Sequence, residues 1–216
     1  MEAHKVDLKI LIPAAAAVLC IEWGARAILQ RVAFSPLMVL GIARVFETAL
    51  FISIASLLGN QGLSTIGIHR NHWHAGLKRG LLWSLGFGFL VGLVFGILYF
   101  LGVDPFVFMK TNMPGSPVDI LLFFLVGALI SPIAEEIFFR GILYGFFRRW
   151  GVWIAIGAST LLFAIAHAAS LGRIPFSQII GGLLFALAYE KEKNLVVPTV
   201  IHVLGNASIF TLGIVA

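Results

Sequence analysis

The chain is short of the residues that disulfide-bonded and many metal-dependent proteins require. Only 12% of its 216 residues are charged, and Cys20 is its single cysteine. One cysteine excludes an internal disulfide and a zinc site built from cysteines. Aspartate is also scarce, and Asp7, Asp104 and Asp119 are the three in the chain. All three lie at the ends of apolar runs or between them, which excludes a protease that uses a pair of intramembrane aspartates.

Signatures of two other hydrolytic sites are missing. The sequence has no His-Glu-x-x-His, so the zinc helix with paired histidines is absent. Ser159 and His167 fall on one expected helix, but eight positions separate them, too many for a direct hydrogen bond along that helix. The formal charge of +5 does not indicate a nucleic-acid partner. In a membrane chain the placement of lysine and arginine matters more than their sum.

The apolar composition indicates a polytopic membrane protein. The chain is 60% hydrophobic, with a mean hydropathy of +1.01. Apolar runs of about 20 residues, the length needed to cross a bilayer, recur along it. We therefore predict an all-α transmembrane helix bundle that forms one integral-membrane domain, residues 1–216. Seven spans are expected, over residues 10–30, 36–58, 80–102, 118–147, 152–170, 176–190 and 195–215.

Two details of this topology stay open. Residues 118–147 fit either one long tilted helix or two shorter pieces, and an eighth short or re-entrant segment has room within 59–80 or 103–117. The first apolar run continues past Ile21 without a clean small-residue cleavage site, so we expect a span there and not a cleaved signal peptide.

Lysine and arginine favour one side of the expected bundle. Nine fall on the side of the N-terminus: Lys5, Lys9, Arg70, Lys78, Arg79, Arg148, Arg149, Lys191 and Lys193. Three fall on the opposite side: Arg31, Lys110 and Arg173. The other three lie within spans: Arg26, Arg44 and Arg140. This bias places the N-terminus in the cytoplasm, and we expect a protein of a bacterial or archaeal inner membrane.

The most informative feature is an ionisable cluster inside the fourth span, made of Glu135, Glu136 and Arg140. Charged side chains within a membrane are costly, so such a cluster is by default a candidate functional site. Glu136 and Arg140 are four apart and share a helix face, whereas Glu135 lies about 100° further round. A structural salt bridge with Arg140 needs only one glutamate. The second glutamate therefore favours a catalytic role for the cluster. A carboxylate in apolar surroundings takes up a proton readily, as a general base must.

Histidine and asparagine in later spans extend the candidate site. Glu135 lies 13 residues before Arg148, and His167 lies 16 residues after Gly151. At about 1.5 Å per residue, an antiparallel hairpin would bring the two side chains within roughly one turn in height. His202 and Asn206 are four apart and face the same way, and Gly205 between them would allow close helix approach. Two hydrogen-bond donors on one face suit an oxyanion site.

Other polar groups in the apolar regions have simpler interpretations. Glu22 with Arg26, and Arg44 with Glu47, can each form an ion pair on one helix, as structural contacts or as the wall of a wet cavity. The segment Ile68–Arg79 carries three histidines, His69, His72 and His74. We interpret it as a basic stretch anchored by tryptophan at the membrane surface, with a metal site as the weaker alternative.

The three motifs together resemble one known family. Glu135-Glu136-x-x-x-Arg140, Phe163-x-x-x-His167 and His202-x-x-x-Asn206 resemble the type II CAAX prenyl endopeptidase and bacteriocin-processing family, also called CPBP or Abi. Its members are glutamic intramembrane proteases. The resemblance covers the catalytic core, about residues 118–210, and the first half of the chain is similar only in being apolar with basic loops.

The resemblance implies an activity and a role for each motif residue. Glu135 and His167 would position and deprotonate the attacking water, and His202 and Asn206 would stabilise the oxyanion. Glu136 and Arg140 would support the site and hold its charge. No metal or other cofactor would be required. The substrate would be a membrane-anchored protein or peptide within the lipid bilayer, cut near a C-terminal tail or a CAAX-like end.

Two alternatives remain at this stage. The first is a non-catalytic membrane carrier, or an immunity or partner-binding protein, whose polar residues line a wet path. The second, weaker one is a zinc hydrolase that uses Glu135, Glu136, His167 and His202, since these residue types can bind zinc.

Overall fold

The computed structural model describes residues 6–106, 113–171 and 175–215, and this part of the chain is helical and without strands. One continuous helix, Pro117–Trp150, is called the motif helix below. It contains α4 (Pro117–Phe123), α5 (Ser131–Glu136) and α6 (Gly145–Phe147), and it ends in a 3₁₀ turn, Arg148–Trp150. The other long helices are α1 (Leu8–Arg31), α2 (Pro36–Leu58), α3 (Trp73–Phe100), α7 (Val152–Leu171), α8 (Phe176–Glu192) and α9 (Val196–Val215).

The observed helices confirm the predicted polytopic all-α fold. By length and composition, α1, α2, α3, the motif helix and α9 could cross a membrane, and α7 and α8 coincide with the two other expected spans. Residues 118–147 belong to one helix. Two short 3₁₀ helices, Gly62–Ile66 and Arg70–His72, precede α3, so residues 59–80 hold no eighth span. α3 begins at Trp73 and not at residue 80, because the polar segment before the apolar run is itself helical.

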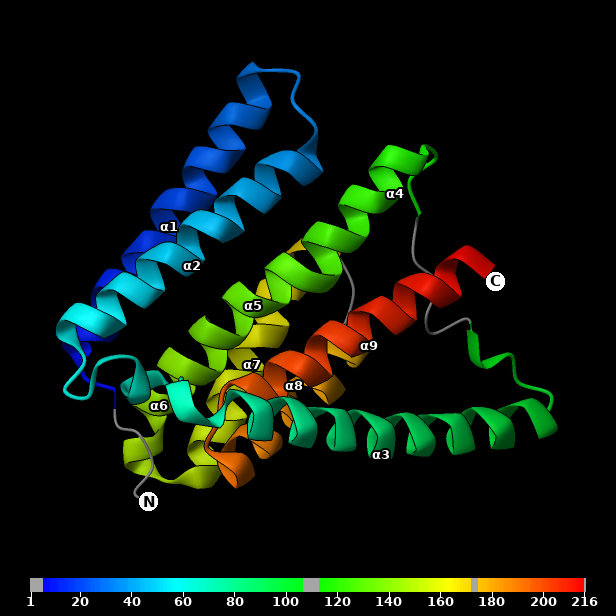
Figure 1. Cartoon of the computed structure of the whole chain (residues 1–216). Helices are drawn as coiled ribbons and strands as arrows, with labels where there is room; N and C mark the ends of the chain where they lie inside the picture. The colour runs from blue at the N-terminus through cyan, green and yellow to red at the C-terminus, as the bar shows by residue number, and fades with distance from the viewer. Residues whose placement is uncertain (1–5, 107–112, 172–174, 216) are drawn as a thin grey trace.

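The helices are arranged around the motif helix (Figure 1). α1 and α2 form a hairpin whose second helix packs against the motif helix. α7 and α8 pack against each other and against the second half of the motif helix, and α9 contacts α8, α5 and α3. α3 diverges from the rest of the bundle along its length (Figure 1). The centre of the bundle is therefore formed by the motif helix, α7, α8 and α9.

Local sequence signals explain where these central helices begin and end. The motif helix starts at Pro117, and the hydroxyl of Ser116 caps it by accepting a hydrogen bond from the Asp119 backbone N–H at 3.1 Å. Gly151, with φ of +122°, makes the reversal into α7. α8 ends at the left-handed Lys193. Asn194 follows it, and its side-chain oxygen accepts from the Val196 N–H at the start of α9 (3.0 Å).

Basic residues gather at one end of the bundle, which is called the basic end below. Arg149 pairs with Asp7 at 3.6 Å, Arg148 with Glu190 at 3.0 Å, and Arg79 with Glu192. Lys9 donates to Asn60 at the same end. These contacts bring together loops expected on one side of the membrane. The assignment of that side to the cytoplasm stays a prediction, and Lys5, Lys110 and Arg173 lie outside the described residues.

The loop between α2 and α3 folds against the basic end. Ile66 is fully buried and lies beside Gly141 of the motif helix, where an added Cβ would meet Ile66 at 3.1 Å. Gly67 adopts φ of +82°, and its carbonyl accepts from the Leu195 N–H at 2.9 Å. The loop is thus fastened both to the motif helix and to the segment that leads into α9.

Gly67→Ala should destabilise the protein by about 2–5 kcal/mol. The left-handed backbone contributes about 1–2 kcal/mol of this, and the new methyl group would lie 2.5 Å from the hydroxyl of buried Tyr189, an overpacking that adds about 1–3 kcal/mol. Gly102→Ala is a matched control, because Gly102 has φ of +74° but open space around it. Thermal unfolding should show the larger loss for Gly67→Ala, and equal losses would contradict the packing of this loop.

Candidate active site

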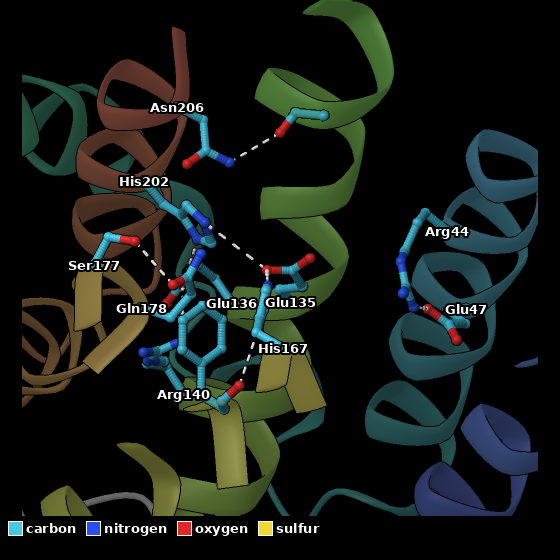
Figure 2. A network of polar contacts seen from close by, with 12 residues as sticks. Arg44, Glu47, Glu135, Glu136, Arg140, His167, Ser177, Gln178, His202 and Asn206 are labelled. Carbon is cyan, nitrogen blue, oxygen red and sulfur yellow. Dashed lines mark hydrogen bonds and ion pairs between the residues drawn. The ribbon is translucent and has the colours of Figure 1, made fainter. Parts of the chain in front are cut away.

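The two glutamates lie on a short α-helical stretch between two π-helical segments. α5 carries Glu135 and Glu136, and the segments Phe124–Ile130 and Ile137–Tyr144 flank it. A π-helical turn contains an additional residue, which rotates the side chains that follow it, and such turns are frequent at functional sites. This irregular helix directs two adjacent carboxylates towards the interior of the bundle (Figure 2).

Glu136 and Arg140 form a fully buried ion pair. Arg140 donates from Nη1 to Oε1 of Glu136 at 3.0 Å, and both side chains have no exposed surface. Arg140 also donates from Nη2 to the carbonyl of Gly182 on α8, at 3.2 Å. Its guanidinium carbon lies 4.6 Å from the ring centre of Phe163 and 5.1 Å from that of Phe185. The cation is thus held by one carboxylate, one carbonyl and the faces of two aromatic rings.

His202 of α9 completes this buried group. Its Nδ1 lies 2.8 Å from Oε1 of Glu136, the oxygen that Arg140 also contacts. A carboxylate paired with arginine accepts hydrogen bonds, so Nδ1 carries the proton and Nε2 faces away from Glu136. The ring of Phe185 stacks on the imidazole at 4.5 Å between centres. Glu136 therefore orients His202 and fixes which nitrogen is available to the rest of the site.

Glu135 lies between two histidines. Its Oε2 is 3.8 Å from Nε2 of His167 and 3.8 Å from Nε2 of His202. The Glu135 side chain is 15% exposed, whereas that of Glu136 has no exposed surface. The two carboxylates thus differ as the helix geometry predicts: Arg140 pairs with one, and the other points elsewhere. Glu135 and His167 meet across the hairpin of the motif helix and α7.

The orientation of His167 follows from its own helix. Nδ1 lies 2.9 Å from the carbonyl oxygen of Phe163, one turn earlier. A carbonyl oxygen only accepts, so Nδ1 donates to it, and Nε2 of the neutral ring is the basic nitrogen. That nitrogen faces Glu135. His167 and His202 both direct Nε2 at the same carboxylate oxygen (Figure 2).

Asn206 lies one turn beyond His202 on α9, facing the motif helix. It donates from Nδ2 to the carbonyl of Gly127 at 2.9 Å, which leaves its second amide hydrogen for another acceptor. The role expected for Gly205 is wrong, because Gly205 is exposed and has nothing within 4 Å of a built Cβ. Gly127 allows the close approach instead, since a Cβ there would meet Phe210 of α9 at 2.9 Å.

The polar groups of the α1–α2 hairpin pair in a different way from that expected. Arg44 bonds to Glu47 on α2, as predicted, but Glu22 of α1 pairs with Arg44 at 2.9 Å and not with Arg26. The guanidinium reaches across the hairpin because Glu22 faces α2. Arg44 and Glu47 lie on the side of the motif helix to which Glu135 points (Figure 2).

Three site residues were missed at the level of sequence. Gly182 and Phe185 of α8 contact Arg140, and Gln178 of the same helix lies beside Glu136 and His202 (Figure 2). Gln178 and Gly182 are four apart and share a helix face. A glutamine one turn before a glycine in an apolar helix is the signal that could have found this face.

Metal binding gains no support from the geometry. Among the described side chains, no group of three or more histidine, cysteine, aspartate or glutamate residues is arranged to hold a metal ion. The weaker zinc alternative at Glu135, Glu136, His167 and His202 is therefore without geometric support. The metal alternative at His69, His72 and His74 has no geometric support either.

Comparison with known proteins shows that the second half of the chain is similar to one family. Residues 117–208 match the family described as Rce1-like, type II CAAX prenyl endopeptidase Rce1-like. This region carries all three motifs. The chain is an integral, multi-pass membrane protein, and residues 117–208 are similar to membrane peptidases of the CAAX type. No solved structure matches it.

Individual proteins are also similar to this chain. The membrane-embedded CAAX protease MroQ of Staphylococcus aureus is 34% identical over 98 residues, which cover 41% of this chain and 37% of MroQ. The putative membrane peptidase YdiL of Bacillus subtilis is 30% identical over 86 residues, 39% of this chain and 34% of YdiL. An uncharacterized 24.3 kDa protein of Escherichia coli is 26% identical over 196 residues, 84% of this chain and 86% of that protein. The matches thus span about a third of each named peptidase.

Proposed function

We propose that this protein is an intramembrane endopeptidase in which Glu135 and His167 activate a water molecule. The observation that carries the proposal is the position of Glu135, with Oε2 3.8 Å from Nε2 of both His167 and His202. These distances are too long for direct hydrogen bonds but suit groups bridged by water. The similarity of residues 117–208 to the Rce1-like family supports the peptidase class.

The tautomers suggest how the water loses its proton. Glu135 as a carboxylate accepts one proton of the water, and the basic Nε2 of His167 accepts a hydrogen bond from the other. The resulting hydroxide attacks the peptide carbonyl. The proton held by Glu135 then passes to the leaving nitrogen, which completes hydrolysis and returns the carboxylate. Arg140 and Glu136 take no part in proton transfer because each is held in the buried ion pair.

His202 and Asn206 would stabilise the negative charge on the tetrahedral intermediate. Nδ1 of His202 is held by Glu136, so a donor at Nε2 requires the doubly protonated ring. The second amide hydrogen of Asn206 provides another donor. Preorganised donors of this kind are often the largest contribution to catalysis.

The substrate class follows from the depth of the site and from the relatives. Glu135 lies near the middle of a helix, Pro117–Trp150, that is apolar enough to cross the membrane. A substrate must therefore bring its peptide bond within the bilayer. The MroQ relative is named a CAAX protease, and we propose a membrane-anchored protein or peptide that is cut near its C-terminal tail or a CAAX-like end.

A single assay tests hydrolysis and the carrier alternative together. Purified protein in lipid vesicles is incubated with a membrane-anchored model peptide in ¹⁸O-labelled water. We expect one ¹⁸O atom in the new C-terminal carboxylate of the product, because the attacking oxygen comes from water. Movement of the intact peptide, or of protons, across the vesicle without cleavage would favour the carrier instead.

Chelation should leave peptide cleavage unchanged. The proposed chemistry uses a carboxylate and a histidine as bases and requires no metal, so dialysis against EDTA or 1,10-phenanthroline should alter the cleavage rate less than twofold. Glu135→Gln, measured in parallel, defines the rate without the base. Loss of activity on chelation, with recovery on added zinc, would contradict the proposal and support the zinc alternative.

A further inference from the structure

The polar groups of the candidate active site differ in how accessible they are. Glu136 and Arg140 have no exposed side-chain surface, and the side chain of His202 is 6% exposed. The side chain of Glu135 is 15% exposed and that of His167 is 28% exposed. A substrate therefore reaches the site from the side on which Glu135 and His167 lie, and the buried groups close the other side.

One face of α8 is directed at this site. The carbonyl of Gly182 accepts from Nη2 of Arg140 at 3.2 Å. The ring of Phe185 stacks on the imidazole of His202 at 4.5 Å between centres. Gln178 lies four residues before Gly182 and seven before Phe185, which is the spacing of residues on one helix face. Figure 2 shows the Gln178 side chain on this face, beside His202.

Gln178 is half-buried, whereas several residues around it on α8 face outwards. Phe176 is 69% exposed, Ile180 is 55% exposed, and Ser177 is exposed as well. A carboxamide directed into an apolar membrane bundle is costly unless its groups are hydrogen-bonded, and such polar residues commonly mark functional sites. The inward direction of Gln178 therefore indicates a role in the site.

The amide of Gln178 retains hydrogen-bonding groups for a ligand. The hydroxyl of Ser177 donates to its Oε1 at 2.8 Å. This contact leaves one lone pair of Oε1 and both hydrogens of Nε2. Among the residues that the structure describes, none accepts a hydrogen bond from Nε2. Such a carboxamide can donate to the carbonyl of a peptide main chain and accept from its N–H.

A peptide that is cut within the bilayer needs partners of this kind. An intact helix pairs its main-chain groups internally, so a segment that is unwound for attack by water exposes them. Main-chain groups left unpaired in hydrocarbon are costly. We infer that Gln178 binds the main chain of an extended substrate segment, with Nε2 donating to a peptide carbonyl next to the scissile one. This inference rests on the proposed peptidase function.

The contact would select the conformation of the substrate and not its side chains. His202 and Asn206 are the donors proposed for the scissile carbonyl, so Gln178 acts on a neighbouring peptide group. Every residue type presents the same main-chain groups when it is extended. The site would therefore take membrane-anchored segments of varied sequence, provided that they unwind.

Peptide binding measured without cleavage tests this contact. The parent protein is Glu135→Gln in lipid nanodiscs, so the probe stays intact whether or not the wild type is a peptidase. The probe is a fluorescein-labelled peptide with a farnesylated cysteine near its C-terminus, and fluorescence anisotropy gives its affinity. Adding Gln178→Met should weaken binding about tenfold, the upper range for one neutral hydrogen bond. Gln30→Met is the matched control, because Gln30 is exposed near the end of α1.

Esters that replace single peptide bonds of the probe locate the contact. An ester has no N–H and a weaker carbonyl acceptor, so an ester at the contacted position should weaken binding to the parent protein. The same ester should have no further effect in the Gln178→Met protein. Equal binding of the all-amide probe by the two proteins, or ester effects that persist at every position in Gln178→Met, would overturn the contact. Cleavage of the probe by the wild type, recorded separately, distinguishes this result from a failure of the proposed peptidase function.

Discussion

Replacing Glu135 by glutamine should abolish measurable peptide cleavage while the protein still folds and inserts. The amide has nearly the same shape as the carboxylate but cannot accept the proton of the attacking water. Loss of a general base lowers rates by about 10²- to 10⁴-fold. Glu135 is partly exposed and has no arginine in hydrogen-bond contact, so its neutralisation should leave the buried Glu136–Arg140 pair intact. Initial rates with a membrane-anchored peptide measure the effect.

Glu22→Gln is the matched control for this substitution. Glu22 is also a glutamate within a membrane helix, with a side chain that is 31% exposed, but it contacts Arg44 and not the histidines. Its variant should retain cleavage within about threefold of the wild type, since exposed or partly exposed ion pairs contribute about 0–1 kcal/mol. Full activity of Glu135→Gln at a matched protein level would exclude Glu135 as the base.

Replacing Arg140 by leucine should be the most destabilising single change in the site. It leaves Glu136 charged, fully buried and without its cationic partner, and breaking one side of a buried pair costs about 3–5 kcal/mol. Arg140→Lys should be less severe because it keeps the positive charge. Lysine has neither the planar fork that reaches Glu136 and Gly182 together nor the stacking on Phe163. Protein levels and thermal unfolding should rank wild type, lysine and leucine in that order.

A double variant separates the unpaired charge from lost packing. Glu136→Gln combined with Arg140→Leu removes the orphaned carboxylate but not the loss of the arginine side chain. It should regain part of the stability that Arg140→Leu alone loses. No recovery in the double variant, together with equal stability of the lysine and leucine variants, would show that the ion pair does not stabilise the fold.

The sequence was sufficient to predict the long helices and the meeting of the motif residues, but not the residues that α8 contributes to the site. Membrane helices are long and apolar, so their number and approximate ends follow from hydropathy and from Pro117, Gly151 and the basic residues between runs. The meeting of Glu135 with His167 followed from residue counts along a hairpin, because the rise per residue of a helix is fixed.

The details that the sequence did not predict depend on helix packing and rotation. The π-helical turns around α5 cannot be seen in a hydropathy pattern, although they set the direction of both glutamates. The predicted partner of Glu22 was wrong because pairing across a hairpin competes with pairing along one helix. The role predicted for Gly205 was wrong because a glycine pattern does not reveal which helix face is buried. Gln178 was missed since α8 carries no charged residue beside it.

Comparison of protein C-termini in membranes from cells that carry the wild type or Glu135→Gln, at matched levels, tests the central claim most directly. The account predicts full-length membrane-anchored substrates that accumulate with the variant alone, and shortened forms that end at one defined position with the wild type. These two forms would also identify the cut site. Identical sets of C-termini in the two strains would contradict the assignment of Glu135 as the catalytic base of a peptidase.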